Sequence, residues 1–154
     1  MSTMFMGSGS NLFLRRAAVE YVNGYDESFR RNQDIEFMTR VFYKYKLAFV
    51  DEMLLEIYQD ENRNKRSYEE SDGYDRYYLS RFSDAIDQLN KQDKKRVISV
   101  ISLERCRYAF IKKKYKIGIK LLFENKVGIT YIVKYFIYLL KRVITHSSYG
   151  FNGR

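Results

Sequence analysis

Two carboxylates, Asp34 and Glu36, stand inside the stretch GYDESFRRNQDIEFMTR, residues 24–40, where the sequence predicts that a helix begins. Apolar residues follow Asp34 at the spacing of one helix face, namely Phe37, Met38, Val41, Phe42 and Tyr45. A carboxylate that heads such a stripe at the rim of a cleft can act as a catalytic base. An aspartate in a first helical turn can equally do no more than stabilise the helix N-terminus. Position alone leaves both roles open.

The elements that must position Asp34 are short. Asn32 is the predicted N-cap of a helix that runs to about residue 45, and Glu36 and Arg40 lie outside its apolar stripe. An earlier helix is predicted over 16–22, ended by Asn23-Gly24. The acceptor-rich turn over 25–29 follows it, where Asp26 and Glu27 can serve only to fix the turn. Short apolar runs predict strands over 11–14, 47–50 and 53–58.

From residue 68 onward the pattern is helical. Ser71-Asp72 is a predicted cap for a first helix, whose apolar face is Tyr78, Phe82, Ala85, Ile86 and Leu89. Further helices are predicted over 93–113, over 117–123 and over 129–144, and Asn125 closes the helix over 117–123. We therefore expect two parts, residues 1–67 and a basic helical tail over 68–154.

The last predicted helix has the clearest periodicity in the chain. Its apolar stripe comprises Ile129, Ile132, Val133, Phe136, Ile137, Leu140, Val143 and Ile144, and its other side carries Lys134, Tyr138, Lys141 and Arg142. The continuous stripe favours packing on the preceding helices. A basic, tyrosine-bearing amphipathic helix can also lie in a membrane interface, so an anionic membrane surface is a second candidate partner.

Composition narrows the class of protein without naming a function. The 28 Lys and Arg against 19 Asp and Glu leave a net charge of +9, which favours an anionic partner. Cys106 is the only cysteine, so we expect it to be a small buried group in a reducing compartment. The chain has neither a secretory signal pattern nor eighteen consecutive apolar residues. We expect a cytoplasmic protein that is either free or peripheral on the cytoplasmic face of the membrane.

Three short motifs then occur in a suggestive order: Ser10-Asn11 with Arg15-Arg16, Asn23-Gly24-Tyr25-Asp26-Glu27, and Gln33-Asp34. With the sequence between them, they resemble the second half of the catalytic domain of family two glycosyltransferases, which have the GT-A fold. The resemblance covers residues 7 to 60. It implies an α/β fold over residues 1–67, with part of a Rossmann-like sheet, followed by the mostly helical tail.

The resemblance implies an inverting transfer of sugar from a nucleotide-sugar to a glycan or lipid-linked acceptor, in the synthesis of surface polysaccharide or other glycans. Asp34 would be the general base, and Gln33 and Asn11 would bind acceptor or sugar hydroxyl groups. Asp26 would order the loop or touch the acceptor. Ser10 belongs to the same motif, and Arg15 or Arg16 would lie near the diphosphate. Each arginine can equally be a solvated or helix-flanking charge.

The departures from the family pattern are equally specific. The family holds a divalent metal, Mg or Mn, with an Asp-x-Asp motif, and no segment here has that spacing. The nearest spellings pair Asp72 with Asp75 and Asp84 with Asp87. His146 is far from the place where many members carry a histidine. We therefore expect a truncated or split enzyme that is inactive alone and depends on a partner chain with the nucleotide-binding half.

A rival hypothesis is a basic helical module that binds nucleic acid or a partner protein. The charge supports it, but the basic residues are scattered over several helices and no nucleic-acid motif is present, so nucleic acid is the weaker choice. In the third alternative, the helical tail docks a partner chain, and the exposed edge of an incomplete sheet would be its sign.

Overall fold

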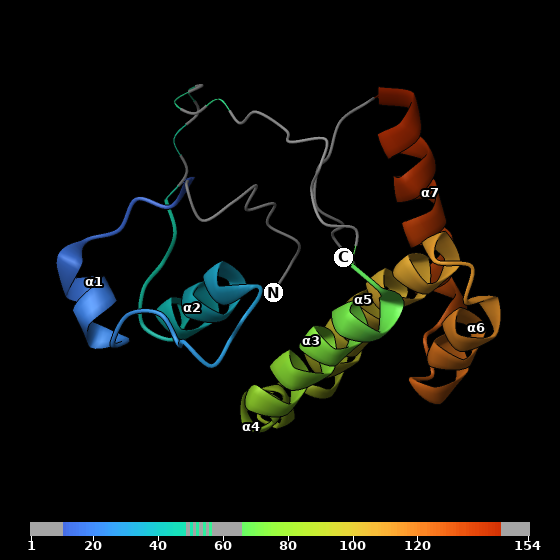
Figure 1. The fold of residues 1–154 in the computed structure, drawn as a ribbon, viewed down its shortest axis with the longest axis horizontal. Helices are drawn as coiled ribbons and strands as arrows, with labels where there is room; N and C mark the ends of the chain where they lie inside the picture. Colours follow the sequence, from blue (N-terminus) through green and yellow to red (C-terminus); the bar gives the residue numbers. More distant parts are fainter. Residues whose placement is uncertain are drawn as a thin grey trace. The chain divides into compact units, whose positions relative to one another are not determined.

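The computed structural model describes residues 11–48, 50, 52, 54, 56 and 66–145 (Figure 1). Contacts divide the chain between Lys65 and Arg66. We call the described residues before this point the N-terminal unit and those after it the C-terminal unit. The N-terminal unit contains α1 (Arg16–Tyr21) and α2 (Gln33–Phe42). The C-terminal unit contains α3 (Tyr68–Arg81), α4 (Ser83–Asp87), α5 (Lys91–Ile111), α6 (Tyr115–Glu124) and α7 (Ile129–Thr145).

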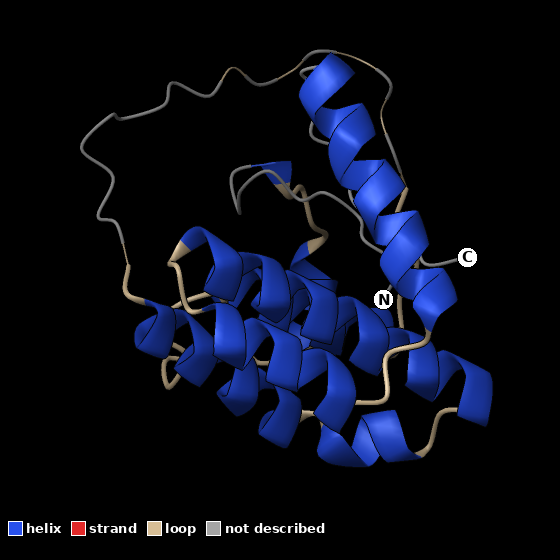
Figure 2. Ribbon diagram, turned by 90° about the vertical axis from the view of Figure 1, so that its right-hand side faces the viewer, coloured by secondary structure: helices blue, strands red, loops and turns tan. Residues whose placement is uncertain are grey.

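The predicted α/β fold is wrong for the described part of the chain, where every regular element is a helix and no residue forms a strand (Figure 2). Residues 11–14 follow an irregular path, and Leu12 and Leu14 pack on the helical core instead of pairing in a sheet. Leu47, Val50 and Leu54 are exposed. A short apolar run needs a neighbouring strand to satisfy its backbone, and the described residues supply none. Most of the predicted strand over 53–58 lies outside the described residues.

The N-terminal unit is built around the buried face of α2. Phe37, Met38 and Val41 form a small core with Val22, which follows α1. The end of α1 is a Schellman motif, in which Gly24 N–H donates to Val19 O (3.0 Å) and Asn23 N–H to Glu20 O (3.1 Å). Both Asn23 and Gly24 have positive φ, as this motif requires of the residue that ends the helix. The predicted stop at Asn23-Gly24 is confirmed.

Side-chain caps explain where the helices of the C-terminal unit begin. Ser67 and Glu70 form a reciprocal capping box on α3, so the predicted cap at Ser71-Asp72 is wrong. Asn90 caps α5 by accepting from Asp93 N–H at 2.9 Å. The predicted closure of α6 at Asn125 is confirmed. Cys106 is buried on α5, as predicted, and burial raises the pKa of its thiol.

The orientation of α7 is the reverse of the favoured prediction, in which its apolar stripe packs on the preceding helices. Tyr135, with Tyr131, Ile132, Tyr138 and Leu139, packs against Leu103 and its neighbours. Most of the apolar stripe is exposed instead: Ile129, Val133, Phe136, Ile137, Leu140, Val143 and Ile144. The reason is that tyrosine buries a large ring and can still satisfy its hydroxyl group, which Tyr135 does with Glu104 at 2.8 Å. None of the described helices is long and apolar enough to cross a membrane.

Candidate functional site

Asp34 lies in the first turn of α2, as its position in the sequence predicts. Its side chain is half-buried, and its Oδ1 accepts a hydrogen bond from Ile35 N–H at 2.9 Å. Asn32 occupies the N-cap position but has a left-handed backbone (φ 57°), and its side chain makes no capping bond. Gln33 is exposed as the first helical residue. The amide of Gln33 and the carboxylate of Asp34 therefore begin α2 without a side-chain cap before them.

The turn that precedes α2 is ordered by Asp26. Its Oδ1 accepts from both Ser28 N–H (2.9 Å) and Ser28 Oγ (2.6 Å). Tyr25 stacks on Phe37 of α2, with ring centroids 4.6 Å apart and an angle of 26° between the rings. Phe29 is buried. The motif around Asp26 is thus packed against the helix that carries Asp34.

An ion pair that the sequence did not reveal holds α2 to the end of α1. Glu36 is fully buried, and its carboxylate accepts from Arg40 Nε (2.6 Å) and Nη2 (2.7 Å). Arg40 also donates to Val22 O and, at 2.8 Å, to Gly24 O. Glu36 raises the pKa of Arg40 by accepting its hydrogen bonds, against the desolvation that lowers it. The spacing of four residues was the only sequence signal for this pair.

The other predicted site residues lie before α1. Asn11 is exposed, and Arg15 is exposed at the N-cap of α1, where its side chain makes no capping bond. Arg16 forms a surface ion pair with Glu20 at 2.7 Å. Ser10 lies outside the described residues. Asp26 therefore lies in the turn before α2, and Gln33 and Asp34 lie in the first turn of that helix.

The described residues do not fit a divalent metal of the kind that the resemblance implies. They contain no group of three or more His, Cys, Asp or Glu side chains that could hold a metal ion. Asp72 is one of the aspartates whose spacing is nearest to the Asp-x-Asp motif, and it already has bonding partners. Its carboxylate accepts from Tyr68 (2.9 Å) and Arg105 (2.8 Å), and it pairs with Arg76. These bonds join α3 to α5, which is a structural role.

A second polar network links α5 to α7. Tyr135 donates its hydroxyl hydrogen to Glu104 and accepts from Arg107 Nε at 3.1 Å. Arg107 also pairs with Glu104 at 2.7 Å. Burial is the largest cause of the raised pKa of Tyr135, and the neighbouring carboxylate adds to it. The network fixes which face of α7 is buried.

Comparison with known proteins adds no assignment to this geometry. No protein-family model, curated protein or solved structure matches the chain.

Proposed function

We infer that the N-terminal unit supplies the acceptor side of a glycosyltransferase active site, with Asp34 as the general base. The supporting observation is the placement of Asp34 on the first turn of α2, a helix anchored by the buried Glu36–Arg40 pair and by the Tyr25–Phe37 stack. A base works when a rigid element holds it within hydrogen-bond reach of the proton that it accepts. Helix α2 is the rigid element that holds the half-buried carboxylate of Asp34.

In the proposed step, the acceptor hydroxyl oxygen forms a bond to the anomeric carbon of the sugar as the bond to the nucleoside diphosphate breaks. The hydroxyl proton passes to the Asp34 carboxylate, and the leaving diphosphate takes the bonding electron pair. Gln33 lies next to Asp34 and can donate to or accept from an acceptor hydroxyl group. The nucleotide-sugar is held by residues that another segment or a partner chain supplies.

The test uses the full chain purified together with the polypeptide that supplies the nucleotide-binding half. Transfer of labelled sugar to an acceptor is measured for the wild type and for Asp34→Asn, which keeps the size and shape of the side chain. We expect Asp34→Asn to lower turnover about 100- to 10,000-fold and to leave donor affinity unchanged. Glu27→Gln, an exposed carboxylate of the preceding turn, is the matched control. Unchanged turnover in Asp34→Asn would remove Asp34 from the mechanism.

A further inference from the structure

The apolar stripe of α7 is exposed on the C-terminal unit. Its seven members recur at intervals of three and four residues, so they form one continuous band along the helix: Ile129, Val133, Phe136, Ile137, Leu140, Val143 and Ile144. Phe136 and Ile137, near the middle of α7, are 61% and 59% exposed. Scattered apolar side chains are normal on a surface, but a contiguous band of this length marks an interaction site.

The buried side of α7 makes this exposure a fixed property of the fold. Tyr135 enters the core beside Leu103, and its hydroxyl group joins Glu104 and Arg107 of α5. Turning α7 to bury the stripe would break these bonds and expose the Tyr135 ring. Figures 1 and 2 both show the C-terminal half of α7 extending away from α3, α4, α5 and α6. The stripe is therefore held outward where α7 packs on α5, and over residues 140–145 every side chain of α7 is exposed.

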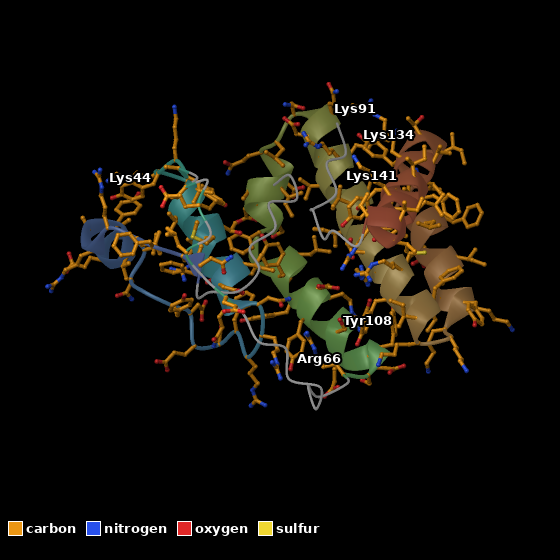
Figure 3. The ribbon with its side chains drawn as sticks, turned by 90° about the horizontal axis from the view of Figure 1, so that it is seen from above. Lys44, Arg66, Lys91, Tyr108, Lys134 and Lys141 are labelled. Atoms are coloured by element: carbon orange, nitrogen blue, oxygen red, sulfur yellow. The ribbon has the colours of Figure 1, made fainter. Side chains whose placement is uncertain are left out.

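Basic residues border the stripe. Lys134 follows Val133 and Lys141 follows Leu140, so both lysines lie about 100° around the helix from the centre of the stripe. They are seven residues apart, on the same side of α7, and both are exposed (Figure 3). Arg142 lies about 160° from the centre of the stripe and does not border it, and the sequence of α7 contains no Asp or Glu. An apolar face with lysines along one edge complements a surface with an apolar interior and a negative outer layer.

A second copy of the chain is a poorer partner for the stripe than such a surface. The narrow seam of a two-stranded coiled coil uses one residue at every third and fourth position, whereas Ile137 and Ile144 widen the exposed band of α7. This width suits a helix that lies at a lipid interface.

We propose that α7 docks on an anionic lipid surface, with its axis along the membrane plane. The stripe enters the boundary between headgroups and acyl chains, and Lys134 and Lys141 extend to the lipid phosphate and carboxylate groups. Because α7 is not long and apolar enough to cross a membrane, the proposed binding is interfacial. The inference goes beyond the proposed sugar transfer and does not depend on it.

The experiment is sedimentation of the full chain with vesicles of phosphatidylcholine alone or mixed with phosphatidylserine. We expect partition into the mixed vesicles, weakened by added salt, and much weaker partition into phosphatidylcholine alone. Lys134→Gln combined with Lys141→Gln is expected to weaken partition about tenfold or more, since each lysine near an anionic surface contributes appreciably. The matched control, Arg31→Gln with Lys46→Gln, removes two exposed charges from the N-terminal unit and should leave partition nearly unchanged.

A second pair of variants tests the stripe itself. Phe136→Ser with Leu140→Ser should abolish partition, whereas Phe13→Ser, which removes a fully exposed ring from the N-terminal unit, should not. Both changes are at exposed positions, and an unchanged circular dichroism spectrum verifies that the helices persist. Equal partition of the Phe136/Leu140 variant and the wild type would overturn the proposal. The proposal would also be overturned if the chain did not bind the vesicles and instead formed a dimer that this variant abolishes.

Discussion

Arg40 forms a two-point ion pair with the fully buried carboxylate of Glu36, one turn earlier on α2. The same guanidinium group donates to the carbonyl oxygens of Val22 and Gly24, which lie just beyond α1. One side chain therefore neutralises a buried charge and satisfies the end of another helix. This relationship, rather than a sheet, joins the two helices of the N-terminal unit.

Replacing Arg40 with methionine keeps much of the apolar stem but leaves Glu36 buried without a counter-charge. We expect Arg40→Met to destabilise the N-terminal unit by about 3 kcal/mol or more, because an unpaired buried carboxylate is costly. Amide hydrogen exchange of α1 and α2 measures the change within this unit. Arg16→Met is the control: its pair with Glu20 has the same spacing but is exposed, so a loss of about 0.5 kcal/mol or less is expected. Similar losses in the two variants would contradict the assigned role of Arg40.

Two helical glycines give opposite predictions for the same substitution. A Cβ on Gly118 of α6 would come within 2.6 Å of the Phe110 ring and 3.3 Å of Cys106 O, both on α5. Gly118→Ala should therefore separate the two helices and lower the free energy of unfolding by about 1–3 kcal/mol. Gly73 of α3 has no neighbour within 4 Å of such a Cβ, so Gly73→Ala should stabilise by about 0.5–1 kcal/mol through helix propensity.

Urea unfolding of the full chain, followed by helical circular dichroism, compares the two alanine variants. Phe110→Leu tests the cause of the loss, because a smaller side chain at this half-exposed position should recover part of the stability of Gly118→Ala. The explanation fails if Gly118→Ala is as stable as Gly73→Ala, since α5 and α6 would then not approach as closely at Gly118.

The end of α5 is a Schellman motif with lysine where glycine is preferred. Lys113 has φ 59°, while Lys114 N–H donates to Ala109 O at 2.8 Å. A left-handed backbone costs a residue with a Cβ about 1 kcal/mol, so Lys113→Gly should stabilise the protein by about 0.5–1 kcal/mol. The neighbouring Lys112 has φ −88°, and Lys112→Gly should destabilise instead. Thermal unfolding of both variants gives the comparison, and a loss of stability in both would refute it.

Sequence reasoning located the long helices because their signals are local. The helix predicted over 93–113 is observed over Lys91–Ile111, and the final helix predicted over 129–144 is observed over Ile129–Thr145. The strands predicted over 11–14 and in the described part of 47–50 failed because a short apolar run becomes a strand only when a distant segment pairs with it. Leu12 and Leu14 pack on the helical core instead.

The details of the sites depended on contacts that are distant in sequence. Asp34 was correctly placed at a helix start, but a glutamate and arginine four residues apart look the same whether they are exposed or buried. What distinguishes this pair from an exposed one is that Arg40 also donates to the carbonyl groups of Val22 and Gly24, 18 and 16 residues away. On α7, Tyr138 was counted on the polar side and Tyr135 was assigned to neither side, although Glu104 and Arg107 allow the ring of Tyr135 to be buried.

Asp75 on α3 gives a prediction about pH. Burial raises the pKa of its carboxyl group from 3.8 to about 6; Arg105 opposes this, and Asp72 and Glu104 reinforce it. Between these two values the folded state holds a proton that the unfolded state has lost, so stability falls as the pH rises from about 4 to about 6. Above this range the folded protein bears the full cost of a charged, partly buried carboxylate. Lowering the pH therefore reverses the destabilising contribution of Asp75.

Asp75→Asn removes this charge without changing the size of the side chain. We expect the variant to be more stable than the wild type at pH 7 by about 2 kcal/mol, and to lose the advantage as the pH approaches 4. Urea midpoints at several pH values measure the difference between the two proteins, which cancels the titration of all other groups. Asp84→Asn, at an exposed position of α4, is the matched control. A difference between Asp75→Asn and wild type that stays constant from pH 4 to 7 would mean that Asp75 titrates alike in the folded and unfolded chains.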